Sequence, residues 1–241
     1  MLLLLSGEGK GDLGCCDMGL LNCSGEQFTP GPMAWFVDQL IEDKLDFSHI
    51  DNSFCYFIPE KKLTEIAKRS SDPVRFPGKK QKKETGFFYK NARALAKEAL
   101  SLQLDQDDRV LAVLFRDADR TQSSSRGEWQ NKWDSMINGF SSQGFDYGVP
   151  MLAEPKSEAW LLCAVKDKPY QYCQQLEKCS GNDNSPESLK TKLAHALNDK
   201  NSSEELSRMV QGKEIDIDQI NMTSVVAFKM RLNEVIQKII P

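Results

Sequence analysis

The 241-residue sequence predicts an α/β fold in which a mostly parallel sheet is flanked by helices and followed by a helical C-terminal extension. Short apolar runs alternate along the chain with longer segments whose apolar residues recur at helical spacing, which is the order of strands and helices in three-layer α/β proteins. Three apolar runs also lead into acidic clusters, at 8–12, 117–119 and 154–158. Because ligands of α/β proteins bind at the carboxyl edge of the sheet, these clusters are the candidates for a functional site.

The first elements are predicted to be a strand, a helix and a second strand. Residues 2–6 form a short apolar run, and the glycines after it give the freedom that a tight turn needs. A helix is predicted to begin at Pro32, because the apolar residues that follow lie on one stripe: Met33, Phe36, Val37, Leu40 and Ile41. Residues 54–58 are predicted to form the second strand.

The middle of the chain adds a loop, two helices and two strands. Residues 69–85 are polar and basic and contain Pro73, Pro77 and Gly78, which is typical of a loop. The next helix is expected to bury Ala92, Leu95, Ala96, Ala99 and Leu100. Residues 109–115 give the clearest strand, since their apolar run is that of a central parallel strand. A helix with Trp129, Trp133, Met136, Ile137 and Phe140 on its buried side then leads to a strand at 147–153.

Residues 1–167 are predicted to form the α/β catalytic domain and residues 168–241 a helical extension packed on it. Within the extension, Ser202 and Glu205 have the spacing of a capping box. The last helix has an apolar stripe of Val225, Phe228, Leu232, Val235, Ile236 and Ile239. We expect this stripe to pack on the sheet rather than to form a dimer seam.

Charge is distributed unevenly along the chain. The formal net charge is −4, yet residues 60–93 hold eleven lysines and arginines and four acidic residues. A basic segment on an otherwise acidic protein indicates a polyanionic partner at one face, although a solvated surface loop would have the same composition. The candidate nucleic-acid-binding residues are Lys79, Lys80, Lys82, Lys83, Lys90 and Arg93.

The cysteines predict reduced thiols and a cytoplasmic protein. Seven are present, an odd number without a CxxC pair, and two lie within apolar stretches, so a disulfide framework is not expected. Zinc binding by Cys15, Cys16 and Cys23 is a weak alternative, because the two histidines lie far away in the sequence. No apolar run approaches the length of a membrane span, so no membrane partner is expected.

Glu8 is the first candidate for chemistry. It comes directly after the first strand, between Gly7 and Gly9, where other groups can approach closely. The segment is not a phosphate-binding Walker loop, because Lys10 is followed by Gly11 and Asp12 and the spacing of that motif is missing. Taken alone, Glu8 would be an ordinary residue of a surface turn.

Asp117 and Asp119 follow the clearest strand. On an extended strand, residues two apart point the same way, so these two carboxylates would repel each other unless a cation lay between them. Mg²⁺ prefers oxygen ligands and uses one or two carboxylates with waters. The alternative is that Arg116 and Arg120 simply pair with them.

Glu154 and Glu158 bracket Lys156 after the last strand. If Glu154 ends a strand and Glu158 begins a helix, both can face one crevice, and a helix N-terminus stabilises negative charge. Lys156 would then steady a phosphate in the transition state. Otherwise Glu158 only complements the helix dipole, and Lys156 forms a surface salt bridge.

In combination these motifs resemble the Toprim domain of topoisomerases, primases and OLD-type nucleases. The residues concerned are Gly-Glu-Gly-Lys-Gly-Asp after the first strand and Asp-Ala-Asp after a later one. The segment from Glu154 to Leu162 is similar to small stand-alone Toprim-like proteins of bacterial phage defence that have ATPase partners. The resemblance covers roughly residues 1–165 and implies a Toprim-like, Rossmann-like sheet; the cysteine-bearing stretch at 15–31 departs from its compact pattern.

By this resemblance Glu8 is the catalytic acid or base and also a metal ligand, and Lys156 lies near the scissile phosphate. The remaining metal ligands would be Asp12, Asp117, Asp119, Glu154 and Glu158. The expected cofactor is Mg²⁺, with Mn²⁺ as a substitute.

The sequence therefore predicts a metal-dependent nuclease that cleaves DNA or RNA, as a toxic effector of anti-phage defence. The alternative from a different class is a non-catalytic Toprim-like module that docks to, and is regulated by, an ATPase partner. A phosphatase or phosphoacceptor domain is disfavoured, because such proteins have a nucleophilic aspartate where this chain has Glu8.

Overall fold

The computed structural model describes the chain except for residues 18–19, 21, 70–82, 120–125 and 241. Its centre is a five-stranded sheet in the order β3-β5-β1-β6-β7. Four strands are parallel: β1 (Leu2–Gly7), β5 (Cys55–Pro59), β6 (Val110–Asp117) and β7 (Gly148–Ala153). The short edge strand β3 (Cys23–Ser24) is antiparallel to β5. The predicted α/β fold with a mostly parallel sheet is confirmed.

The central strands β1 and β6 are apolar because helices cover both of their faces. All six residues of β1 are buried, and so are the first seven of β6. In the register of the two strands Leu3 pairs with Leu111 and Gly7 with Phe115. In a strand buried on both faces, polar and apolar residues do not alternate. The apolar runs of β1 and β6 are therefore continuous in the sequence.

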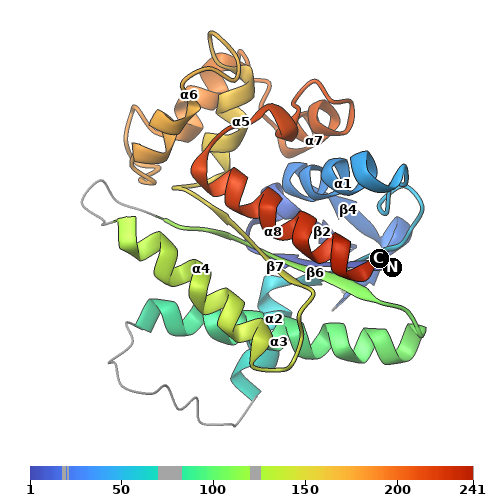
Figure 1. Cartoon of the computed structure of the whole chain (residues 1–241). Coiled ribbons are helices and arrows are strands. Elements are labelled where there is room, and N and C mark those ends of the chain that lie inside the picture. The colour runs from blue at the N-terminus through green and yellow to red at the C-terminus, as the bar shows by residue number, and fades with distance from the viewer. Residues whose placement is uncertain (18–19, 21, 70–82, 120–125, 241) are drawn as a thin grey trace.

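Alternate residues of these strands contribute to two separate hydrophobic clusters. Leu3 and Leu5 pack into the larger cluster with α1 (Pro32–Leu45), α5 (Ser157–Val165) and α8 (Thr223–Ile239). Leu2 and Leu4 pack into the smaller one with α2 (Glu60–Arg69), α3 (Lys83–Gln106) and α4 (Arg126–Ser141). Figure 1 shows α1 and α8 on one side of the sheet and α3 and α4 on the other. The molecule thus has the three layers that the sequence predicts.

The chain changes direction between β1 and β6. After β1 it continues to α1 on one face, whereas after β6 it continues to α4 on the opposite face. The two loops therefore leave neighbouring strands in opposite directions at the carboxyl edge of the sheet. In doubly wound sheets this switch point is where ligands bind.

A smaller two-stranded sheet and a helical C-terminal region complete the fold. The strands β2 (Gly14–Cys16) and β4 (Phe28–Pro30) form an antiparallel pair beside α1. The C-terminal region contains the short helices η3 (Cys173–Lys178) and η4 (Ile217–Gln219), α6 (Leu189–Ala196), α7 (Ser203–Gln211) and α8. The capping box of Ser202 and Glu205 is confirmed at the start of α7.

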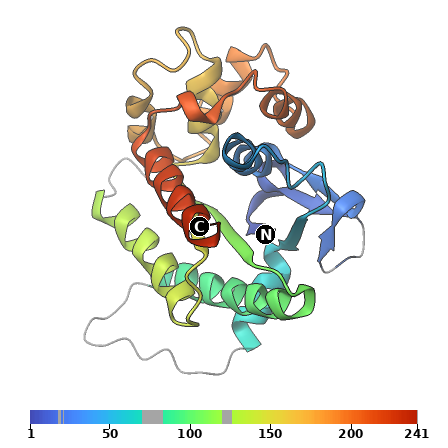
Figure 2. The same cartoon turned by 45° about the vertical axis from the view of Figure 1, so that its right-hand side comes forward.

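The C-terminal region packs directly on the sheet. Helix α8 contacts β7 and β6, and its apolar stripe belongs to the larger hydrophobic cluster. The buried indole of Trp160 in α5 donates a hydrogen bond of 2.9 Å to the hydroxyl of Ser224 in α8. The Arg109 guanidinium donates to the Ile239 carbonyl, which ties the end of α8 to the start of β6. The two chain ends lie close together (Figure 2). The boundary at residue 167 stays a prediction.

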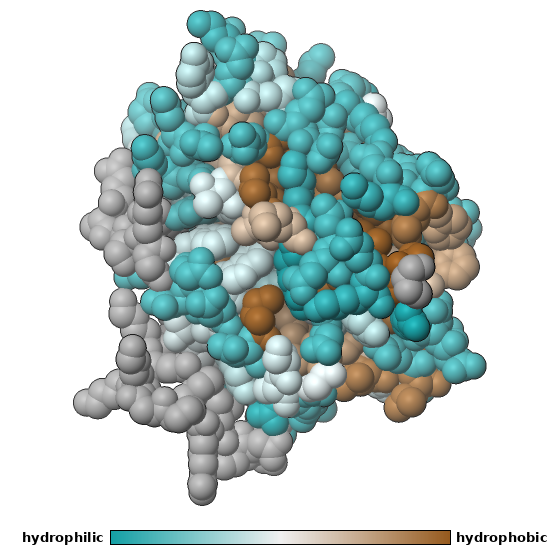
Figure 3. Space-filling model, viewed as in Figure 1, coloured by the Kyte–Doolittle hydropathy of each residue, from teal (hydrophilic) through white to brown (hydrophobic). Residues whose placement is uncertain are grey.

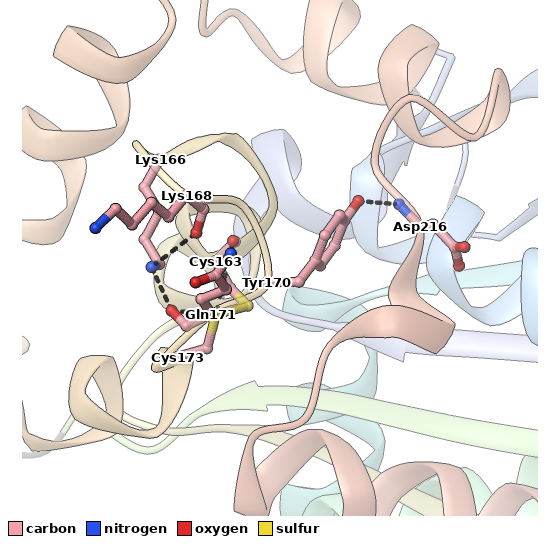
Figure 4. The surroundings of a disulfide bond; sticks show 7 residues. All are labelled: Cys163, Lys166, Lys168, Tyr170, Gln171, Cys173 and Asp216. Carbon is pink, nitrogen blue, oxygen red and sulfur yellow. Dashed lines mark hydrogen bonds between the residues drawn. A yellow bond between two sulfur atoms is a disulfide. The ribbon is translucent and has the colours of Figure 1, made fainter.

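Four cysteines form disulfides, Cys16 with Cys23 and Cys163 with Cys173. Near the second bond, the Asp216 N–H donates to the Tyr170 hydroxyl, which links this loop to the segment before η4 (Figure 4). Cys15, Cys55 and Cys179 remain as thiols. The expectation of a fully reduced protein is wrong because cysteines seven and ten residues apart in sequence are folded back onto each other. The cytoplasmic location deduced from that expectation stays a prediction.

The face of the molecule seen in Figure 1 is mostly hydrophilic, with hydrophobic side chains in small separate patches (Figure 3). Among the described helices none has the combination of length and apolar character needed to cross a bilayer.

Candidate active site

Glu8 and Asp117 meet at the switch point although they are 109 residues apart. Strand β1 ends at Gly7, whereas β6 continues to Asp117. The Asp117 N–H therefore lies beyond the last residue of β1, and a Glu8 carboxylate oxygen accepts its hydrogen bond in place of a backbone carbonyl. The register of β1 and β6 thus fixes Glu8 at the carboxyl edge of the sheet.

Asp12 is brought back to the same edge by a glycine turn. The segment η1 (Gly9–Leu13) is a single tight turn, and Gly9 has a φ of 78°. A Cβ atom on Gly9 would lie 2.1 Å from Asp12 Oδ2. Glycine is thus required at position 9 for two reasons. The backbone conformation is left-handed, and the Asp12 carboxylate occupies the space that a side chain would fill.

Ser157 joins two of the carboxylates. Its backbone N–H donates to Asp117 Oδ1 at 2.9 Å, and its hydroxyl donates to Asp12 Oδ1 at 2.6 Å. Ser157 is the first residue of α5, and the N-cap position belongs to Lys156. The sequence does not point to Ser157, because its contact with Asp12 crosses 145 residues and leaves no local signal.

The electrostatics of the site are those of crowded, buried carboxylates. Burial raises the pKa of Asp117 well above its usual value, and the charges of Asp12, Glu8 and Glu158 raise it further. Burial likewise raises the pKa of Asp12, Glu8 and Glu158. Arg116 and the Asp117 N–H lower the pKa of Glu8 but do not offset its burial. Holding all these groups ionised requires additional positive charge in the crevice.

Glu158 has one carboxylate oxygen without a partner among the described residues. Its Oε2 atom is buried and has no hydrogen-bond partner within the described part of the chain. An unpaired buried oxygen costs free energy, so this atom is available to a ligand. Glu154 is also buried, directly after β7. It is Glu158, in the first turn of α5, whose charge acts on Asp117.

Lys156 lies at the mouth of the site and pairs with acidic residues there. Its ammonium group is 2.8 Å from an Asp183 carboxylate oxygen and 3.6 Å from one of Asp119. Burial alone would lower the pKa of Lys156, but Asp183 and Asp119 raise it above its usual value, so the lysine is charged at neutral pH. Asp183 was missed in the sequence because it lies in an irregular segment without a motif.

Asp119 does not follow the strand alternation on which its prediction was based. Strand β6 ends at Asp117, and Asp119 has a φ of 47°. The side chain of Asp119 is 62% exposed and lies beside Lys156, whereas Asp117 points inward to Ser157. The two aspartates of the Asp-Ala-Asp motif therefore occupy different environments.

Arg116 does not serve as a simple partner of Asp117. Its side chain is fully buried, with a guanidinium nitrogen 3.5 Å from Glu60 and the group 5.3 Å from the centre of the Phe87 ring. It packs on the α2–α3 side of the sheet, and its positive charge acts on Glu8. Asp117 is thus left without a cationic side chain of its own strand, and Arg120, the other arginine of that alternative, lies outside the described residues.

The carboxylate oxygens of the site fit a hard divalent cation that takes few ligands from the protein. Among the described residues, no three acidic, histidine or cysteine side chains gather closely enough to form a metal cage. Mg²⁺ does not require one, since it commonly binds one or two carboxylates and keeps several waters. Asp117 and Asp12, which Ser157 links, supply ligands of this kind, and the unpaired oxygen of Glu158 adds to the excess negative charge around them.

The predicted nucleic-acid-binding residues are described only in part. Lys79, Lys80 and Lys82 lie outside the described residues, and of Lys83 only its place at the start of α3 is described. Lys90 is exposed on α3, and Arg93 is half-buried. The Phe87 ring near the start of α3 lies against the Arg116 guanidinium near the end of β6, so the first turns of α3 lie toward the edge that holds Glu8 and Asp117.

Fold and site together define the class of protein: a doubly wound α/β protein with a cluster of buried carboxylates at the switch point of its sheet. Comparisons with protein-family models, curated proteins and solved structures gave no match. The resemblance to Toprim domains therefore rests on the sequence motifs alone.

Proposed function

We propose that the protein is a metal-dependent nuclease that hydrolyses phosphodiester bonds in DNA or RNA. The observation that carries the proposal is the convergence of Glu8, Asp12, Asp117 and Glu158 at the switch point, in a crevice short of positive charge. Acidic side chains from separate turns rarely approach one another without a cation, because each raises the free energy of ionising the next.

Each residue has a distinct role in this proposal. Asp117 and Asp12 would hold Mg²⁺ or Mn²⁺ together with waters, beside the charge of Glu158, and the bound ion would supply Lewis-acid activation of the phosphate and of water. Glu8, whose pKa is raised by burial, is suited to exchange a proton with the reacting oxygen. Lys156 is held at the mouth by Asp183 and Asp119, where its charge can stabilise the phosphate in the transition state.

The nucleic-acid strand is proposed to enter from the side of α3. Lys90 is exposed there, and the basic segment precedes this helix in the chain. Lysine contacts with phosphates position a strand without reading its sequence, so binding should weaken steeply as salt is added.

The direct test is cleavage of labelled single-stranded and double-stranded DNA and RNA with Mg²⁺, Mn²⁺ or EDTA. We expect cleavage with either metal, none in EDTA, and a loss on the order of 10²- to 10⁴-fold in Glu8→Gln, which keeps the acceptor for the Asp117 N–H but cannot transfer a proton. The matched control is Asp43→Asn, which changes an exposed acid that pairs with Lys213 near the end of α1.

Cleavage that persists in EDTA, or that Glu8→Gln leaves unchanged, would contradict this mechanism. A role in phage defence and control by an ATPase partner remain proposals from the resemblance. They predict that expression of the wild-type chain, but not of Glu8→Gln, damages nucleic acid in cells.

A further inference from the structure

A second cavity opens beside Glu8, on the side of β5. It has a volume of about 470 Å³ and lies between the end of β1, with Gly7 and Gly9, and the passage from β5 to α2, with Pro59, Glu60 and Lys61. The acidic crevice lies on the other side of β1, toward β6. The two spaces therefore share the turn that carries Glu8, and a ligand in the cavity would adjoin the reacting group.

The wall of the cavity combines a fixed apolar surface with positive charge at the rim. Leu20, which is 39% exposed, contributes the apolar surface that a ligand can reach. Phe57 is only 2% exposed and closes the cavity behind it, with its ring stacked on Phe28 at 4.8 Å between centroids. Lys10 and Lys61, which are both exposed, also line the cavity, together with the carboxylates of Asp17 and Glu60. An apolar pocket with a few polar groups at its edge is the usual form of a small-molecule site, and this one falls within the usual range of about 300–1000 Å³.

A buried positive charge lies behind this wall. Arg116 is 3.5 Å from Glu60, which itself lines the cavity. Its three guanidinium nitrogens have no hydrogen-bond acceptor within the described residues. The guanidinium partly offsets the charges of Glu60 and Glu8, so the cavity is less repulsive to an anionic ligand than its acidic residues alone would make it.

We propose that this cavity holds one unpaired nucleotide of the substrate, next to the scissile bond. The base would pack against Leu20 above the buried edge of Phe57, and its phosphate would lie between Lys10 and Lys61. The inference rests on the proposed nuclease function and adds the substrate class: a strand whose base is free to leave the stack, as in single-stranded DNA or RNA. A base inside a continuous duplex would first have to be flipped out, at a cost in stacking and pairing.

The test is equilibrium binding of small probes to the full chain in EDTA, where no metal-dependent cleavage occurs. The probes are thymidine 5′-monophosphate, uridine 5′-monophosphate and inorganic phosphate, measured by calorimetry or NMR titration. We expect both nucleotides to bind at least about tenfold more tightly than phosphate, because stacking on an apolar wall adds to the charge interaction. Comparing the two nucleotides shows whether the pocket favours DNA or RNA.

Two lysines of α2 give a matched pair of variants. Lys61 lines the cavity, whereas Lys68 is exposed on the same helix and is not part of the cavity wall. Lys61→Glu should weaken nucleotide binding about tenfold, and Lys68→Glu should leave it within twofold of wild type. A single-stranded oligonucleotide should show the same difference between the variants, whereas a blunt duplex should not.

Nucleotides that bind no more tightly than phosphate would overturn the inference, and so would an equal effect of the two lysine variants. These outcomes are independent of catalysis. If the nucleotides bind as expected but no metal supports cleavage, the pocket stands and the nuclease proposal fails. If cleavage occurs without selective nucleotide binding, the nuclease stands and the pocket proposal fails.

Discussion

Asp117 shows at the level of a single residue how the fold sustains an unfavourable charge. Its carboxylate is held by the Ser157 N–H but is surrounded by Asp12, Glu8 and Glu158. Such an arrangement lowers stability in the absence of a counter-ion, as functional sites commonly do. The free energy that the ionised group costs is recovered when a cation binds only the folded state.

The pH dependence of stability follows from this crowding. Because the pKa of Asp117, Glu8, Asp12 and Glu158 is raised in the folded state, these four groups bind more protons in the native protein than in the unfolded chain above pH ~4; burial lowers the pKa of His49, which acts in the opposite direction but on one group only. Stability without metal should therefore fall as pH rises through the raised pKa values and then level off. Thermal unfolding in EDTA should give a higher Tm at pH 5 than at pH 8.

The variant Asp117→Asn separates this effect from other titrations. It keeps an acceptor for the Ser157 N–H but removes the charge, so at pH 8 in EDTA we expect it to raise the Tm by about 2–4 °C per kcal/mol gained. The dependence on pH should also become shallower. A lower Tm for the variant at pH 8, with an unchanged pH profile, would show that the carboxylate is not under electrostatic strain.

At the scale of elements, the site depends on how β1 turns into η1. Gly9 has a φ of 78°, and a Cβ atom added to it would lie 2.1 Å from Asp12 Oδ2. Gly144 has a comparable φ of 65° but no atom within 4 Å of an added Cβ. The two glycines therefore separate backbone strain from displacement of the Asp12 carboxylate.

This pair gives a controlled prediction. Gly9→Ala and Gly144→Ala should each cost about 1–2 kcal/mol in urea unfolding, because alanine is strained in the left-handed region. Only Gly9→Ala should also weaken divalent-metal binding and cleavage, since it must move Asp12. Equal loss of metal binding in both variants would mean that the turn has no special role at the site.

The strands of this edge could be predicted from sequence, but several side-chain contacts could not. The apolar run of β6 and the glycines after β1 are local signals, and they correctly placed Glu8 and Asp117 at one edge. The links through Ser157 and Asp183 join segments distant in sequence, and no local pattern encodes them. The expectation that Asp119 points the same way as Asp117 is wrong, because the strand ends two residues earlier, at Asp117.

At the scale of the whole molecule, the doubly wound sheet and the C-terminal helices act as one framework for the crevice. Helix α5 follows β7, carries Ser157 and Glu158, and is held by α8 through Trp160 and Ser224. Fold class and the apolar face of α8 could be predicted because both depend on hydrophobic periodicity. The disulfides could not, because pairing depends on which cysteines the finished fold brings together.

The cysteine pairing predicts a specific labelling pattern. Alkylation of the unfolded, non-reduced protein should modify three cysteines, Cys15, Cys55 and Cys179, and reduction beforehand should raise the number to all seven. Peptide mass spectrometry should then find Cys16 linked to Cys23 and Cys163 linked to Cys173. Seven modified cysteines without reduction would show that the bonds do not form in the isolated protein.

The central claim is that the crevice between β1 and β6 holds a divalent cation, and a calorimetric titration of Mn²⁺ or Mg²⁺ into the metal-free protein at pH 7.5 tests it most directly. The account predicts saturable binding that weakens at least about tenfold in Asp117→Asn, which removes a charged ligand, and is unchanged in the surface control Asp43→Asn. The absence of saturable binding to the wild-type chain, or equal affinity of Asp117→Asn, would contradict it.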